Sequence, residues 1–358
     1  MKQEKLFKGL KVVDLSTVLA GPSVATFFSE LGAEVIKIEN KKTQGDVTRK
    51  WKLPSEKSDA VTAYFSSVNY KKQYIYLDLS TAEDQDQLKK LIMDADILVS
   101  NLKYGDDKKF GVSYEELSKL NSKLIYAHLS GYISQHFRTA YDVALQAETG
   151  YMSMNGTIAS GPLKMPVALI DVLAAHQLKE GILCALFQRF TSGKGSYVST
   201  SLEASAVAAL TNQATNYLMA GYEPELSGSE HPNISPYGET VTCGDNKQIV
   251  LAVGADKQFL HLCELLGIPE IALDDRFAQN VSRVINREQL YAILSKPFLA
   301  KTRDEWMTEL TARQIPAGAV HNLSELFARK EINDLILHEV IDGTETKRVK
   351  SVVFEISE

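Results

Sequence analysis

The sequence lacks the features that would place the protein in a membrane, in a disulfide-linked fold or around a structural metal. None of its apolar runs approaches the roughly 20 residues of a membrane-spanning helix, and its start lacks a signal-peptide profile. Its three cysteines, Cys184, Cys243 and Cys263, are odd in number, far apart and without metal-ligand spacing. We therefore expect a reduced cytoplasmic protein with no membrane association and no metal site.

An excess of positive charge is missing as well. Lys and Arg number 39 against 45 Asp and Glu, and the net charge of -6 argues against nucleic acid as the main partner. The content of 44% hydrophobic and 23% charged residues is that of an ordinary soluble globular protein. A length of 358 residues predicts two packed domains.

Two catalytic fingerprints are also absent. Gly21 stands alone in the turn Ala20-Gly21-Pro22, without a Gly-x-Gly-x-x-Gly motif, so NAD binding is disfavoured although Glu39 falls about 20 residues on. The lack of a Gly-x-Ser-x-Gly elbow disfavours a serine hydrolase. The turn at Gly21 still precedes a predicted helix, whose N-terminal N–H groups suit some other phosphate-bearing ligand.

The first third of the chain alternates between strand and helix patterns. Short β-rich runs predict strands at residues 10–15, 33–39, 73–79, 95–100 and 123–129. Helical patterns between them cover residues 23–31, 81–94 and 114–120. Strands separated by helices form parallel sheets with crossover connections, so we predict an α/β fold with a Rossmann-like large domain.

The remainder predicts two long helices and then a smaller unit. The helical patterns span residues 170–190 and 202–219, and the Gly-, Ser- and Pro-rich stretch 221–233 is typical of a linker. A strand pair at 239–243 and 248–253, followed by helices to about residue 313, predicts a smaller α+β domain. A further helix is expected at 323–328.

Basic residues recur beside the predicted strand ends. Ligands of parallel sheets bind beyond the carboxyl ends of the strands, so this clustering suits a ligand with several phosphates. The residues are Lys41, Lys42, Arg49, Lys71, Lys72, Lys103, Lys108 and Lys109.

Asp171 is the one carboxylate at the start of the most apolar predicted helix. A buried, unpaired carboxylate is costly, so Asp171 either caps the helix or takes part in chemistry. With an ordinary pKa near 4, and at a helix N-terminus that favours an anion, it is expected to be ionised at neutral pH.

Several segments in this order together resemble the class III CoA-transferases, the family also named for carnitine CoA-transferase and the bile-acid-inducible proteins. The opening blocks read LKVVDLSTVLAGP, LGAEVIKIE and GDVTR, followed by NYKKQYIYLDL. The later blocks read ADILVSNL, YDVALQAETG, SGKG, HPNISPYG and DRFAQN. The resemblance covers essentially the whole chain.

The resemblance implies an interlocked, ring-shaped homodimer whose subunits each have a large and a small domain. We expect residues 1–195 to form the first part of the large domain, 196–230 a helical linker, 231–313 the small domain and 314–358 a segment that returns to the large domain. CoA and acyl-CoA are then substrates, with a carboxylic acid as acceptor and no permanently bound cofactor. The activity implied is CoA transfer through aspartyl-anhydride and aspartyl-CoA thioester intermediates.

The family's catalytic aspartate falls on Asp171. The family's CoA contacts fall on Leu19, Ala20, Leu77, Asn101, Leu102, Lys109 and Tyr141, and the candidate set for CoA and substrate also includes Asn40, Arg49, Lys103 and Arg138.

The chain departs from the formyl-CoA transferases at three positions. Thr17 stands where they have His, Asn40 where they have Arg and Ser80 where they have Lys, so Lys41 or Lys42 is expected to take over phosphate recognition. Formyl or oxalyl specificity is disfavoured for the same reason. Their glycine-rich loop over the aspartate has no clear counterpart between Asn212 and Gly254.

Two alternatives remain open from the sequence. Racemases of 2-methylacyl-CoA share the fold and pair the aspartate with a histidine, but that position is Tyr141 here, and the nearby His136 is out of register. This difference favours transfer over racemisation. The other alternative is a CoA-binding dimer without activity.

Overall fold

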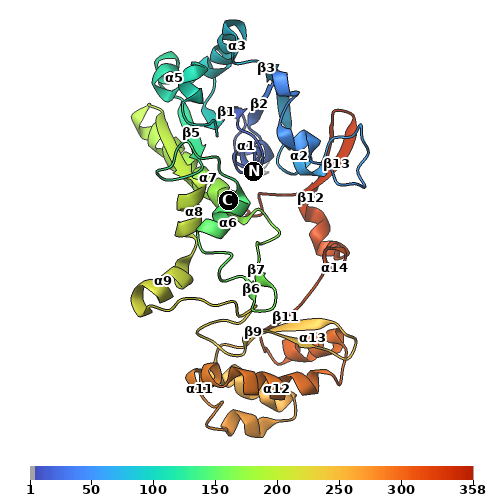
Figure 1. The fold of residues 1–358 in the computed structure, drawn as a ribbon. Coiled ribbons are helices and arrows are strands. Elements are labelled where there is room, and N and C mark those ends of the chain that lie inside the picture. Colours follow the sequence, from blue (N-terminus) through green and yellow to red (C-terminus); the bar gives the residue numbers. More distant parts are fainter. Residues whose placement is uncertain (1–4, 358) are drawn as a thin grey trace. The chain divides into compact units, whose positions relative to one another are not determined.

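The computed structural model describes residues 5–357, which fall into two compact units (Figure 1). The first unit comprises the chain up to Tyr151, Lys164–Thr215 and the segment from Glu331 on. The second comprises Met152–Leu163 and Asn216–Lys330. Each unit is made of segments that are distant in sequence, so the chain passes between the units several times.

A six-stranded parallel sheet forms the centre of the first unit, as the alternating pattern predicts. The strand order is β3-β2-β1-β4-β5-β8. The strands are β1 (Lys11–Leu15), β2 (Glu34–Asn40), β3 (Lys72–Leu77), β4 (Ile97–Ser100), β5 (Ile125–Ser130) and β8 (Ser196–Ser201). The segment of β8 was expected to begin a helical linker, which is wrong. It pairs with β5 as an edge strand, and its alternating polar residues carry little of the apolar signal by which strands are found.

Helices cover both faces of this sheet (Figure 1). On one face, α1 (Ala20–Glu30) and α7 (Leu169–Ser192) pack over the side chains of Val12, Val35 and Ile97. On the other, α3 (Ala82–Met93) and α5 (Tyr114–Leu120) pack over the alternate residues of the same strands. The first unit also contains α2 (Ala63–Ser67), α4 (Asp106–Lys109), α6 (Asp142–Glu148), α8 (Leu202–Ala208) and the hairpin of β12 (Ile336–Ile341) with β13 (Thr344–Val349).

The helix predicted at 202–219 is two helices, α8 and α9 (Thr211–Ala220). Thr211 has a φ of 41°, which lies outside the right-handed helical region. The regular backbone hydrogen bonding is therefore interrupted at this residue, although the apolar pattern of the sequence continues through it.

The second unit holds a three-stranded antiparallel sheet of order β11-β10-β9. Its buried core includes Phe259, Phe277, Phe298 and Trp306. The strands are β9 (Tyr237–Thr242), β10 (Gln248–Ala252) and β11 (Ala317–Ala319), with a short pair of β6 (Gly156–Thr157) and β7 (Gly161–Pro162). The helices are α10 (Asp256–Leu265), α11 (Asn280–Ile285), α12 (Arg287–Phe298), α13 (Arg303–Ala312) and α14 (Leu323–Phe327).

The C-terminal segment is tied to the first unit by a buried carboxylate. Glu30, at the end of α1, accepts hydrogen bonds from the backbone N–H groups of Ser351 and Val352 and pairs with Arg348. In the part of the chain that the structure describes, no helix is both long and apolar enough to cross a membrane.

Candidate active site

The carboxyl ends of the parallel strands bring most of the predicted site residues to one edge of the sheet. The strand order changes direction between β1 and β4, and α/β proteins commonly bind ligands beside such a point. Leu19 and Ala20 follow β1 there, and Asn101 and Leu102 follow β4. Asn101 uses its amide group to bind both backbone groups of Thr17, at 3.0 and 2.9 Å, so the loops after β1 and β4 are joined.

A pocket of about 340 Å³ lies at the end of β2. Asn40 ends β2 and lines the pocket, and its side-chain amide oxygen accepts the backbone N–H of Lys42 at 2.9 Å. The Lys42 ammonium lies 3.1 Å from the Asp78 carboxylate and donates to Ser80. Lys50 lines the pocket and is exposed, although it was not among the predicted site residues.

Both predicted arginines already pair with carboxylates of the protein. The guanidinium of Arg49 lies 2.6 Å from the Glu39 carboxylate and 2.8 Å from Asp342, and it stacks over the Phe65 ring. Arg138 pairs with Glu148. Both side chains therefore have protein partners before any ligand is bound.

The other predicted contacts differ in exposure. Leu77 ends β3 beside Asn40 and is buried, so it offers almost no surface to a ligand. Lys103 is exposed after β4, Lys109 ends α4 and lies 5.2 Å from the Phe110 ring centre, and Tyr141 is exposed just before α6.

The basic cluster seen in the sequence is only partly a surface cluster. Lys72 is the first residue of β3 and is buried, with its ammonium 2.8 Å from the Asp14 carboxylate. Grouping it with the loop lysines was wrong, because it neutralises an internal charge instead of facing a ligand.

Asp171 lies in the first turn of α7 and its side chain is not the cap of that helix. The N-cap residue is Ala168, and the N–H of Ile170 donates to the Asp142 carboxylate at 2.7 Å. Asp171 is only 8% exposed, and within residues 5–357 we find no hydrogen bond that its carboxylate accepts. The cap is therefore supplied by a carboxylate from α6, and no described residue donates a hydrogen bond to Asp171.

Asp142 is itself held by a short chain of hydrogen bonds. Gln146, one turn later on α6, donates to Asp142 at 2.7 Å and accepts the N–H of Met165 at 2.7 Å. Gln146 is fully buried. These contacts fix the segment before α7 and hold two carboxylates at its start. Sequence reasoning did not single out Asp142 and Gln146, although both lie in the block YDVALQAETG, because the sequence does not show that this block contacts residues 19 and 28 positions later.

The expectation of an ordinary pKa for Asp171 is wrong. Burial, with the nearby negative charge of Asp142 as a second cause, raises the pKa of Asp171 to about 7. Burial and the charges of the same two carboxylates raise the pKa of Tyr64 to about 12. Tyr64 lies in α2, is half-buried and packs edge-on against Trp51, with ring centres 5.1 Å apart. Tyr64 is thus a neighbour of Asp171 that no sequence motif marked.

Metal-ligating groups are not gathered at this site. Within the described ranges, no group of three or more His, Cys, Asp or Glu side chains is placed to hold a metal ion.

Comparison with known proteins identifies the family. Residues 7–358 match CoA-transferase family III. The chain is 35% identical to a succinate–glutarate CoA-transferase of Agrobacterium fabrum, over 96% of this chain and 88% of that protein. It is 31% identical to a human succinyl-CoA:glutarate CoA-transferase, over 94% and 77%.

Comparison with solved structures supports the same family. A CaiB/BaiF family protein from Brucella suis has a TM-score of 0.82 and 34% identity, covering 97% of this chain and 92% of that one. A protein from Mycobacterium tuberculosis has a TM-score of 0.86 and 28% identity, covering 99% and 94%. The resemblance noted in the sequence is confirmed: the chain belongs to CoA-transferase family III and is a CoA-transferase.

Proposed function

We propose that the protein transfers CoA from an acyl-CoA to a carboxylic acid with Asp171 as the nucleophile. The observation that carries the proposal is a buried carboxylate with no hydrogen bond of its own, held at the start of α7 beside a second carboxylate. Such an arrangement is costly to keep for stability alone, and carboxylates with strongly perturbed pKa values are concentrated at active sites.

The proposed reaction uses Asp171 as a temporary acyl carrier. Its oxygen attacks the thioester carbon of the donor, the C–S bond breaks, and an acyl-aspartyl anhydride and CoA thiolate form. The thiolate then attacks the aspartyl carbonyl, which releases the donor acid and leaves an aspartyl-CoA thioester. The acceptor carboxylate attacks this thioester to form a second anhydride and releases the thiolate again. Attack of that thiolate on the acceptor acyl group gives the new CoA ester and frees Asp171.

The residues that follow the strand ends are proposed to hold CoA. Leu19, Ala20, Asn101 and Leu102 lie together beside the switch in strand order, and Asn40 lines the neighbouring pocket. We add Lys50 to the predicted cations, because it borders this pocket while Lys42 is paired with Asp78.

The rate is expected to follow the ionisation of Asp171. Below pH about 7, kcat/KM for the acyl-CoA should fall as Asp171 becomes protonated, since only the carboxylate can attack. Asp142→Asn should move this limb to lower pH, because it removes a negative charge and still offers an oxygen to the Ile170 N–H. The measurement is the pH profile of thioester exchange, with His176→Gln on the same helix as the control. The assignment of this pH dependence to Asp171 would be contradicted if the acid side of the profile stayed in place in Asp142→Asn. A shift in His176→Gln would contradict it as well.

We further propose that the acceptor is a dicarboxylic acid. The relatives at 28–35% identity include transferases named for succinate and glutarate, for oxalate, for mesaconate and for D-citramalate. All of these acids carry two carboxylates. The proposal replaces the earlier expectation, which went no further than an unspecified acid.

A matched pair of acceptors tests this proposal. Labelled CoA transfer from succinyl-, acetyl- and butyryl-CoA should be measured to glutarate and to pentanoate, which differ mainly in the second carboxylate. We expect glutarate to be preferred by about 100-fold or more, since a site built for a polar group strongly rejects an analogue that lacks it. Equal use of the two acids would refute a dicarboxylate site.

Two assays separate the alternatives left by the sequence: CoA transfer tests for an inactive CoA-binding dimer, and deuterium exchange tests for a racemase. A racemase exchanges deuterium at C2 of a 2-methylacyl-CoA without an acceptor, and a transferase does not. Retention of Asp171 and the CoA-transferase relatives favour transfer over both racemisation and an inactive CoA-binding dimer.

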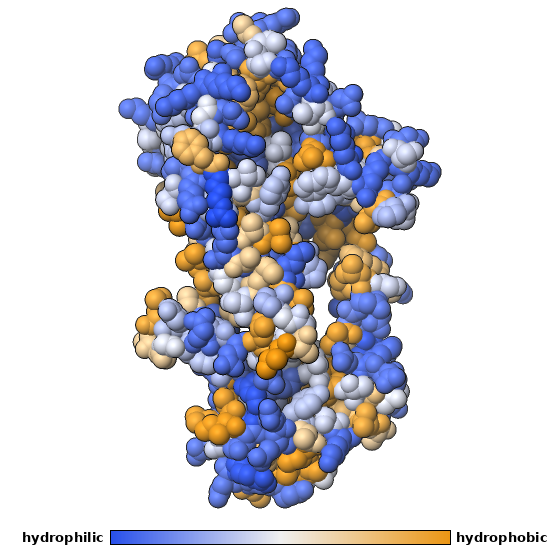
Figure 2. Space-filling model, in the orientation of Figure 1, coloured by the Kyte–Doolittle hydropathy of each residue, from blue (hydrophilic) through white to orange (hydrophobic). Residues whose placement is uncertain are grey.

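A homodimer is the proposed assembly. Exposed apolar side chains lie on α7, where Phe187 is 75% and Phe190 is 90% exposed, and hydrophobic surface also gathers over α9 (Figure 2). Exposed apolar patches of this kind are commonly covered by a partner subunit. Sedimentation of the intact chain tests the stoichiometry. The interlocked arrangement and a cytoplasmic location stay predictions.

A further inference from the structure

The loop that follows β1 contains an unusual backbone conformation. Val18 has a φ of 72°, in the left-handed region, which β-branched residues rarely adopt because the side chain crowds the backbone. Such outliers persist only where their surroundings hold them, and they are concentrated at functional sites. Val18 directly precedes Leu19 and Ala20, two of the proposed CoA contacts.

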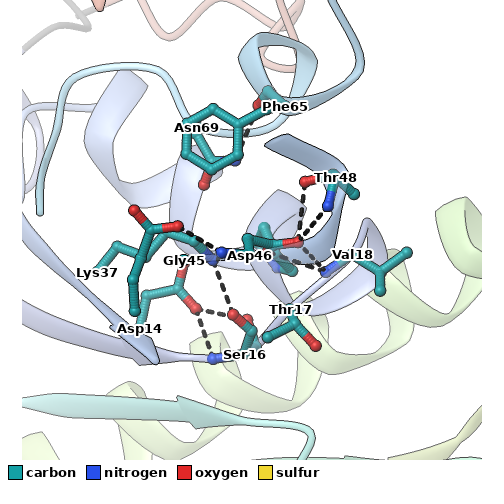
Figure 3. A network of polar contacts seen from close by, with 12 residues as sticks. Asp14, Ser16, Thr17, Val18, Lys37, Gly45, Asp46, Thr48, Phe65 and Asn69 are labelled. Carbon is teal, nitrogen blue, oxygen red and sulfur yellow. Dashed lines mark hydrogen bonds and ion pairs between the residues drawn. The ribbon is translucent and has the colours of Figure 1, made fainter. Parts of the chain in front are cut away.

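Asp46 supplies the contact that holds Val18 (Figure 3). The N–H of Val18 donates to the Asp46 carboxylate at 3.1 Å, and Asp46 also accepts the N–H and the hydroxyl of Thr48. The carboxylate is 3.3 Å from the ammonium of Lys37, whose side chain is completely buried. Lys37 in turn donates to the backbone oxygen of Ser16 at 2.7 Å. One buried ion pair thus holds the loop at both Ser16 and Val18.

The position of Asp46 is fixed from the other side by the end of β2. Its N–H donates to the Glu39 carboxylate at 2.8 Å. Gly45 has a φ of 102°, and a Cβ there would lie 2.8 Å from Glu39 and 2.9 Å from Arg49, so only glycine fits this turn. Asp46 is therefore presented to the loop by rigid neighbours.

The loop leaves backbone donors available at its outer end. Leu19 is the N-cap of α1, this helix has no side-chain cap, and across residues 5–357 we find no acceptor for the N–H groups of Leu19 and Ala20. Donors at a helix N-terminus suit the oxygens of a phosphate or a pantetheine amide. Their direction is set by the conformation of Val18.

We propose that Asp46 is a positioning residue for CoA binding: it holds Val18 in the left-handed conformation, so that the N–H groups of Leu19 and Ala20 face the bound CoA. This inference rests on the proposed function, because it takes the ligand to be CoA. Asp46 itself touches the loop and not the reacting atoms. Its loss should therefore weaken CoA binding and leave the chemical step largely unchanged.

A double-mutant cycle between positions 18 and 46 tests the inference, with the Kd for CoA measured by calorimetry. Asp46→Asn should raise the Kd about tenfold, the range expected when a hydrogen bond loses its charged partner. Val18→Gly should bind CoA normally, because glycine adopts a positive φ without strain. In the Val18→Gly variant, Asp46→Asn should raise the Kd for CoA by about threefold or less, because the effects of two directly coupled residues are not additive.

Val18→Pro breaks the same contact without touching the buried charges. Proline has no N–H and cannot adopt a positive φ, so we expect CoA binding to weaken about tenfold or more with the fold intact. The variant keeps the test decisive if Asp46→Asn does not fold. In steady-state assays, both single variants should raise KM for the acyl-CoA while kcat stays within about threefold of the wild type.

Glu30→Gln is the matched control, because it also weakens a buried ion pair of the first unit, with Arg348, but lies away from the loop. It should lower thermal stability and leave the Kd for CoA unchanged. Normal CoA binding by Asp46→Asn and Val18→Pro overturns the inference. It is also overturned if Asp46→Asn weakens CoA binding by the same factor in the wild type and in the Val18→Gly variant. Absence of CoA binding by the wild type would instead refute the proposed function together with the inference.

Discussion

Replacing Asp171 by asparagine or alanine is expected to abolish CoA transfer while CoA still binds. Without the carboxylate no acyl-aspartyl anhydride can form, and loss of a nucleophile commonly lowers kcat by about 1,000-fold or more. The measurement is thioester exchange beside calorimetry with CoA. Hydroxylamine trapping of the wild type with acyl-CoA, followed by mass spectrometry, should place the adduct on the peptide that contains Asp171.

The same asparagine variant should be more stable than the wild type at pH 8. Burial and the charge of Asp142 raise the pKa of Asp171 from 3.8 to about 7, so the folded state binds a proton that the unfolded state has lost over this interval. The wild type is therefore progressively destabilised as the pH rises from about 4 to 7, by roughly 1.4 kcal/mol for each unit of pKa difference. Asp171→Asn carries no such charge, so its advantage should be on the order of 2–4 kcal/mol at pH 8 and vanish below pH about 4.

Glu180→Gln is the control for both effects, because it removes an exposed acid from the same helix. It should change neither turnover nor stability. Wild-type-like turnover by Asp171→Asn would refute the nucleophile assignment, and an unchanged unfolding free energy at pH 8 would refute the buried, unpaired state of the carboxylate.

Lys72→Met is expected to lower the free energy of unfolding by about 3–5 kcal/mol, since it removes one partner of a buried ion pair. The ammonium of Lys72 lies 2.8 Å from the Asp14 carboxylate and also donates to the backbone oxygens of Pro22 and Val68 and to the Asn69 side chain. These four acceptors lie in β1, at the start of α1 and in the segment between α2 and β3, so Lys72 joins all three to β3. Their loss should be seen in urea unfolding followed by circular dichroism.

The charges around Asp14 explain why Lys72→Met should lower the free energy of unfolding so strongly. Burial by itself would raise the pKa of this carboxylate, but the ammonium groups of Lys37 and Lys72 outweigh that effect and hold the pKa at about 2. In the methionine variant Lys37, at 3.7 Å, is the remaining cationic partner of Asp14. Lys42→Met is the matched control: its ion pair with Asp78 is exposed, so about 0–1 kcal/mol is expected. Equal effects of the two substitutions would contradict the structural role of Lys72.

The strands of the large unit could be predicted because their apolar, β-branched runs are bounded by turn residues. The register and the extra edge strand β8 could not be predicted, because β8 forms by pairing with β5 and has little apolar content of its own. The same holds for the break before α9. Thr211 continues an apolar helical pattern, and its left-handed backbone is a property of the folded chain.

The sequence by itself determined the α/β class, the family and the prominence of Asp171, because periodicity and ordered motifs are local properties that survive in a one-dimensional pattern. Only the tertiary structure decided which carboxylate caps α7, since Asp142 reaches Ile170 across 28 residues. It also decided the pKa of Asp171 and the burial of Lys72, because desolvation and charge–charge interactions depend on distances through space that sequence spacing does not specify.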